Sequence, residues 1–145
     1  LLAAVCLMLR SSELPPSALL GIVHIEAEQV YAYFIQDGSL VFERQLSSSL
    51  TRKEADAIET LSQEFSRAYQ LSQTASGSAA LHHVYLLGAT PAHLQHVLST
   101  RLSVGVSTLD PWQQLPAKSG VGVGEHEHPS ACALACGLAL RGFDA

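Results

Sequence analysis

The strongest constraint on this chain is a stretch between Ala18 and Leu46 that contains three apolar, alternating runs. The three runs are Leu19–Ala27, Val30–Ile35 and Leu40–Leu46. Each has the β-branched content and the period of two that are typical of strands. Between the second and third runs, Asp37-Gly38 is a strong hairpin signal, because both central positions of such a turn need positive φ. The stretch therefore predicts a three-stranded antiparallel meander.

A long amphipathic helix is expected next. Thr51-Arg-Lys-Glu54 is a capping box, in which two side chains satisfy the first backbone amides of a helix. Apolar residues then recur at helical spacing, which predicts a helix of about 20 residues that ends near Gln73.

A strand, a helix and a strand follow. The apolar run His83–Leu87 predicts a strand buried on both faces. Thr90 and Pro91 suit the N-cap and the first position of the next helix. Val104–Leu109 predicts a second strand, parallel to the first after a right-handed crossover.

Composition limits the classes of function. The chain has 145 residues, 48% of them hydrophobic and 14% charged, which fits one folded domain. Its net charge of −5 argues against a nucleic-acid surface and against binding to anionic membranes. Three cysteines, Cys6, Cys132 and Cys136, are too few for a disulfide framework and favour a reducing compartment.

The two ends of the chain are apolar. The nine residues of Leu1–Leu9 fall short of the roughly 20 that a membrane span needs. We expect residues 1–14 to form a helix that continues from a missing N-terminal part, and residues 15–145 to form the domain. Pro129–Leu140 predicts a closing helix that is apolar nearly all round and therefore buried. Two such helices favour self-association of the isolated chain as a homo-oligomer.

A metal site is the rival chemical interpretation of the C-terminal region. Its ligands would be His126, His128, Cys132 and Cys136, with the two cysteines one helical turn apart. Structural zinc sites use closer cysteine pairs, and small Ala and Cys residues in an apolar helix are more often packing residues. We therefore expect no metal site. Four other histidines are expected at the surface: His82, His83, His93 and His96.

The predicted order of elements is three strands, helix, strand, helix, strand, helix. This is the plan of a ribonuclease H-like subdomain of the actin-like ATPase fold, an α/β structure with a mixed sheet of about five strands and helices on both faces. Within that plan the chain resembles the PilM family of type IV pilus assembly proteins and the related MshI proteins of MSHA (mannose-sensitive haemagglutinin) pili. The segments that carry the resemblance are Ala133–Asp144, Phe65–Tyr69, Val84–Gly88 and Leu109–Trp112.

The resemblance implies a non-catalytic scaffold of a pilus-assembly platform. Such a protein would lie in the bacterial cytoplasm, peripheral to the inner membrane, and would bind membrane-anchored, PilN-like assembly proteins. It would neither bind nucleic acid nor span the membrane. Two alternatives stay open: an actin-like ATPase whose active site lies partly outside this chain, and a cytoplasmic, GspL-like domain of a type II secretion platform.

The nucleotide motifs of the resembled fold are altered in this chain. Actin-like ATPases carry an Asp-x-Gly-x-Thr phosphate loop on their first hairpin, and here His24, Glu26 and Glu28 stand at those three positions. Two carboxylates would repel the phosphates of ATP. The second motif, a Gly-Gly turn, is reduced to Gly88-Ala89. We therefore expect a degenerate site with no catalytic residue and no cofactor, with ATP and magnesium possible only if the full-length protein binds nucleotide.

Overall fold

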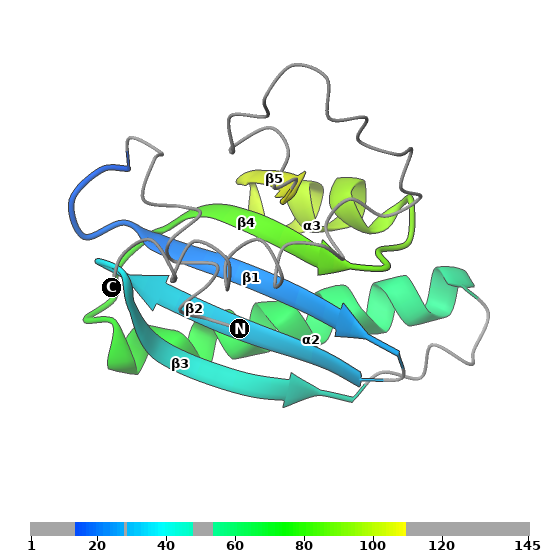
Figure 1. The fold of residues 1–145 in the computed structure, drawn as a ribbon, viewed down its shortest axis with the longest axis horizontal. Coiled ribbons are helices and arrows are strands. Elements are labelled where there is room, and N and C mark those ends of the chain that lie inside the picture. Colours follow the sequence, from blue (N-terminus) through cyan, green and yellow to red (C-terminus); the bar gives the residue numbers. More distant parts are fainter. Residues whose placement is uncertain (1–13, 28, 48–53, 110–145) are drawn as a thin grey trace, which may run out of the picture.

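The structure is a computed structural model that describes residues 14–27, 29–47 and 54–109. A five-stranded sheet forms one layer, and two helices form a second layer on one of its faces (Figure 1). Four of the predicted features lie wholly or mostly outside the described residues: the helix over 1–14, the capping box, the closing helix over 129–140 and the rival metal ligands. Among the described helices, none is long and apolar enough to cross a membrane.

The predicted meander is confirmed. Its strands are β1 (Leu19–Glu26), β2 (Gln29–Gln36) and β3 (Ser39–Leu46). β1 pairs antiparallel with β2, and β2 pairs antiparallel with β3. At the second turn Asp37 has φ +50° and Gly38 has φ +76°, so both central residues are left-handed, as the Asp-Gly signal requires.

Two further strands complete a mixed sheet. They are β4 (Leu81–Gly88) and β5 (Gly105–Thr108), and the strand order is β3-β2-β1-β4-β5. β4 runs parallel to β1 on one side and to β5 on the other. The order and directions confirm the predicted ribonuclease H-like sheet, including the parallel crossover.

The two described helices share one face of the sheet. They are α2 (Glu54–Ala75) and α3 (Leu94–Leu102), and they also contact each other. The expected start of α3 is wrong, because its N-cap is His93 rather than Thr90. The Leu94 N–H bonds to the Pro91 carbonyl at 3.2 Å, so the chain makes a tight turn before the helix begins.

The core lies between this helical layer and the sheet. The rings of Phe34 on β2 and Phe65 on α2 stack with centroids 5.2 Å apart, and both side chains are fully buried. Leu94 and Leu98 anchor α3 on the same face. The opposite face of the sheet also holds buried apolar side chains, namely Leu20, Ile22, Ile35 and Leu87. Strands β1 and β4 therefore carry buried apolar residues on both faces, as their nearly continuous apolar runs predict.

Candidate functional site

The carboxyl ends of β1 and β4 lie side by side, because the two strands are parallel and Ile25 is paired with Gly88. In open α/β sheets, ligands bind at the carboxyl ends of the strands. We call this place the β1–β4 end. Gly88 has φ +87°, and a Cβ at this position would lie 1.9 Å from the carbonyl oxygen of Ile25. No side chain fits there, so glycine is required by the close approach of the two backbones.

His24 lies one residue before this close approach. Its ring stacks on Tyr31 of β2, with centroids 6.5 Å apart. Partial burial lowers the pKa of His24, which favours the neutral imidazole, and the nearby Glu26 carboxylate opposes that shift only in part. The Nδ1 atom of His24 is buried and has no hydrogen-bond partner within the described part of the chain.

Glu26 is the last residue of β1, and its side chain is exposed. The next residue, Ala27, has φ +49°, so the chain turns sharply toward β2. The structure thus brings His24, Glu26 and Gly88 to the β1–β4 end, while Glu28 lies outside the described residues. An incoming phosphate would meet the Glu26 carboxylate here, which repels negative charge, and the His24 ring, whose lowered pKa disfavours the cationic form.

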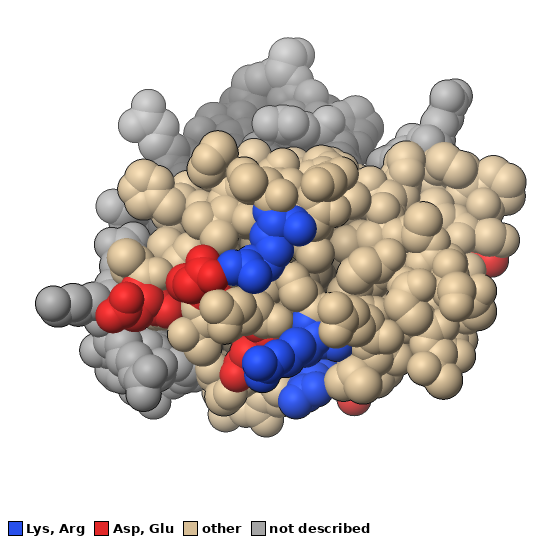
Figure 2. Space-filling view, turned by 180° about the vertical axis from the view of Figure 1, so that it is seen from behind, with Lys and Arg blue, Asp and Glu red and all other residues tan. Residues whose placement is uncertain are grey.

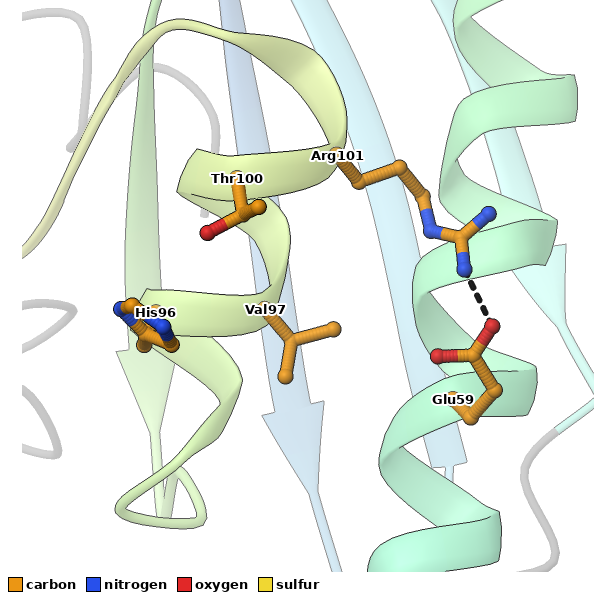
Figure 3. Close-up of a pocket in the computed structure, with 5 residues that line it drawn as sticks. All are labelled: Glu59, His96, Val97, Thr100 and Arg101. Atoms are coloured by element: carbon orange, nitrogen blue, oxygen red, sulfur yellow. Dashed lines mark hydrogen bonds and ion pairs between the residues drawn. The ribbon is translucent and has the colours of Figure 1, made fainter.

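A second concave feature lies between the two helices (Figure 3). This groove, with a volume of about 420 Å³, is lined by Glu59, His96, Val97, Thr100 and Arg101. Val97 points into the gap between α3 and α2, and Arg101 reaches across it to Glu59.

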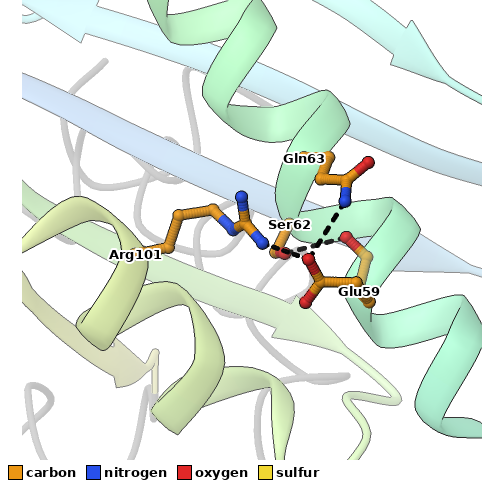
Figure 4. A network of polar contacts seen from close by, with 4 residues as sticks. All are labelled: Glu59, Ser62, Gln63 and Arg101. Carbon is orange, nitrogen blue, oxygen red and sulfur yellow. Dashed lines mark hydrogen bonds and ion pairs between the residues drawn. The ribbon is translucent and has the colours of Figure 1, made fainter.

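The polar groups of the groove are satisfied largely by one another (Figure 4). The Glu59 carboxylate accepts a hydrogen bond from Gln63 at 3.0 Å and forms an ion pair with Arg101. These two donors lower the pKa of Glu59, with the Gln63 hydrogen bond as the largest cause. Ser62 donates to the Glu59 backbone carbonyl at 2.9 Å. The network ties α3 to α2 and, within the part of the chain that the structure describes, pairs the charged groups of Glu59 and Arg101 with each other.

Comparison with known proteins identifies the family. The sequence model of the family "Type IV pilus assembly protein PilM" matches residues 56–143, which is more than half of the chain. The chain belongs to the PilM family. No curated protein matches it.

Two solved structures share the fold of this chain. The PilM-PilN type IV pilus biogenesis complex superposes with a TM-score of 0.64 at 20% identity, covering 99% of this chain and 52% of that chain. The AlfA filament bound to AMPPNP superposes with a TM-score of 0.53 at 17% identity, covering 99% of this chain and 43% of that one. At these identities the likeness shows the fold alone. This PilM-family chain spans about half the length of the solved relatives that it matches.

One expectation about the histidines is wrong. His83 was expected at the surface, but it is half-buried, and its Nε2 lies 2.7 Å from the Ser107 hydroxyl of β5. Its ring also contacts Tyr85, with centroids 4.6 Å apart. Burial lowers the pKa of His83, and neighbouring His82 lowers it further. The other three histidines, His82, His93 and His96, are exposed as expected.

Sequence reasoning missed both the groove and the His83–Ser107 contact. Arg101 and Glu59 are 42 residues apart, and a single sequence holds no signal that pairs them. For His83 a signal was present, because the residue opens an apolar run assigned to a buried strand. Within the described ranges, no cluster of three or more metal-ligating side chains occurs.

Proposed function

We propose that this PilM-family chain is part of a non-catalytic scaffold in the platform that assembles type IV pili. The observation that carries the proposal is the family match over residues 56–143. The residues at the β1–β4 end support the proposal that the scaffold is non-catalytic. His24 and Glu26 stand there, and the chain offers neither a metal-binding aspartate nor a phosphate-binding hydroxyl where the fold's ATPases use them. The narrower assignment to MSHA-type pili stays a prediction.

The proposed partner is a membrane-anchored, PilN-like assembly protein. Support comes from the solved complex with the same fold, in which a PilM is assembled with a PilN. A scaffold with such a partner would act in the cytoplasm at the inner membrane. No cofactor is required for this role. The β1–β4 end, with His24, Glu26 and Gly88, would then be a degenerate nucleotide site.

Binding to the PilN-like protein of the same organism tests the scaffold proposal. The full-length protein that contains this chain is purified and titrated with the cytoplasmic segment of that PilN-like protein in a calorimeter. We expect a saturable one-to-one complex whose affinity is the same with and without ATP and magnesium. Absence of a complex would overturn the partner, and an affinity that changes with nucleotide would overturn the non-catalytic scaffold in favour of a nucleotide-driven one.

A further inference from the structure

Within the part of the chain that the structure describes, strand β3 is an outer edge of the sheet. It is the last strand in the order, and among the described residues it pairs with β2 alone. It is eight residues long and mostly exposed, whereas β5 at the other edge has four residues. Leu40 on β3 is 41% exposed. The outer backbone groups of such a strand are a template for a further strand.

Helix α2 runs beside this edge in the opposite direction (Figure 1). The Ser47 hydroxyl, just after β3, donates to the Glu64 carboxylate of α2 and marks a point where the two elements meet. Arg44 lies three residues before Ser47 in the chain, and Arg67 lies three residues after Glu64 on α2. Because the two elements are antiparallel, both arginines lie on the same side of the contact. Arg44 is paired with the core residue Ala32, which places it on the helix-bearing face.

Two apolar side chains accompany these arginines. Phe42 lies two residues before Arg44 on the same face of β3, is half-buried, and its ring centroid is 6.2 Å from that of Phe34. Leu71 is 50% exposed and lies seven residues, or two helical turns, beyond Glu64 on the same side of α2. Together, Phe42, Arg44, Arg67 and Leu71 form what we call the β3–α2 edge.

The charges of this edge indicate what would cover it. The structure describes three Lys or Arg residues, Arg44, Arg67 and Arg101, and Figure 2 shows blue cationic groups near the middle of the helix-bearing face. Arg101 is paired with Glu59, but within the described ranges neither Arg44 nor Arg67 has an ion-pair partner. In a chain of net charge −5, two such exposed guanidinium groups favour a carboxylate from another molecule.

We propose that the β3–α2 edge binds an extended peptide segment of a partner protein. The segment adds a strand to β3, sets a carboxylate against Arg44 and Arg67, and lays an apolar side chain against Phe42 and Leu71. Main-chain hydrogen bonds supply affinity in this mode, and the side chains supply specificity. The inference is independent of the proposed pilus role, because it follows from the edge and its charges alone.

A short peptide provides the probe. We choose fluorescein-labelled Ser-Glu-Thr-Val-Thr-Glu-Ser, which places glutamate, valine and glutamate on one side of a strand. Fluorescence anisotropy is measured with the 145-residue chain, with Arg67→Gln, and with Arg101→Gln as a matched control elsewhere on the helix-bearing face. Two further peptides carry N-methyl groups, one on both threonines and the other on the valine and glutamates. Circular dichroism verifies that each variant is folded.

We expect saturable binding that Arg67→Gln weakens about threefold to fivefold and that Arg101→Gln leaves unchanged. Only one of the two methylated peptides should lose binding, since alternate N–H groups of an added strand face the edge. Absence of saturation at about 1 mM peptide, equal losses in both variants, or binding by both methylated peptides would each overturn the proposal. So would a dimer of the chain alone that Arg44→Glu dissociates, since a second copy would then occupy the edge.

Discussion

Two glycines at turns of the sheet adopt left-handed conformations for different reasons. Gly38, in the hairpin between β2 and β3, has φ +76°, and a Cβ there would meet nothing within 4 Å. Gly88, at the end of β4, has φ +87°, and a Cβ there would collide with the backbone of Ile25. The first position needs only conformational freedom, whereas the second needs an absent side chain. The close approach of β1 and β4 therefore depends on Gly88, whereas the hairpin at Gly38 imposes no such contact.

Substitution of Gly88 by alanine should have the largest effect. The new Cβ would lie 1.9 Å from the Ile25 carbonyl oxygen, so β1 and β4 must separate at the end where they meet. Together with the left-handed φ, we expect the free energy of unfolding to fall by about 3 kcal/mol or more. Urea denaturation measures this loss. If Gly88→Ala lowered the free energy of unfolding by only about 1 kcal/mol, as expected for alanine at the open turn of Gly38, the backbones of β1 and β4 would not be held together there.

Gly105→Ala should have an intermediate effect. Its Cβ would lie 2.7 Å from Nδ1 of the His83 ring, and that ring can move only by losing its contact with Ser107. We expect a loss of about 1–2 kcal/mol. The double variant Gly105→Ala with His83→Ala provides a cycle, because removal of the ring should remove most of the penalty. Additive losses in this cycle would contradict the proposed crowding.

Gly38→Ala should cost less, about 1 kcal/mol, since only the left-handed backbone is unfavourable for alanine. Asparagine tolerates this conformation better, so Gly38→Asn should recover part of the loss. The measurement is again urea denaturation. If Gly38→Ala were as harmful as Gly88→Ala, the distinction between the two turns would be wrong.

The dependence of stability on pH should show the smallest effect. The pKa values of His24 and His83 are both lowered, mainly by burial, so the unfolded chain binds more protons than the folded chain once the pH falls below about 6.5. Stability should therefore be fully present above that pH and should decline as the pH falls through the folded pKa values. His83→Gln should flatten this decline, and exposed His96→Gln should not. Equal profiles for both variants would exclude the contribution of His83.

The sequence determined the meander well because its signals are local. Turn chemistry at Asp37-Gly38 and alternation along β1, β2 and β3 depend on neighbouring residues only, and the strands begin and end within two residues of the predicted limits. The start of α3 was misplaced because Thr90 and Pro91 match a local rule that the turn after Gly88 overrides.

The candidate site was predictable only in part. The positions of His24, Glu26 and Gly88 were predicted from the motif order of the resembled fold, and the parallel pairing of β1 and β4 brings them to the β1–β4 end. The reason why Gly88 must be glycine depends on a backbone contact with Ile25, 63 residues earlier, which no local pattern encodes. The ion pair that crosses the groove between α2 and α3 was missed for the same reason.

A nucleotide titration tests most directly whether the β1–β4 end is unable to bind the phosphates of ATP. The chain is heated in the presence of ATP and magnesium up to millimolar concentration, beside a variant with His24→Asp, Glu26→Gly and Glu28→Thr. A ligand at 100 times its dissociation constant would add about 2.7 kcal/mol to the free energy of unfolding. We expect no change in the melting temperature of the unaltered chain and a rise in the variant. A saturable rise in the unaltered chain would contradict the degenerate site.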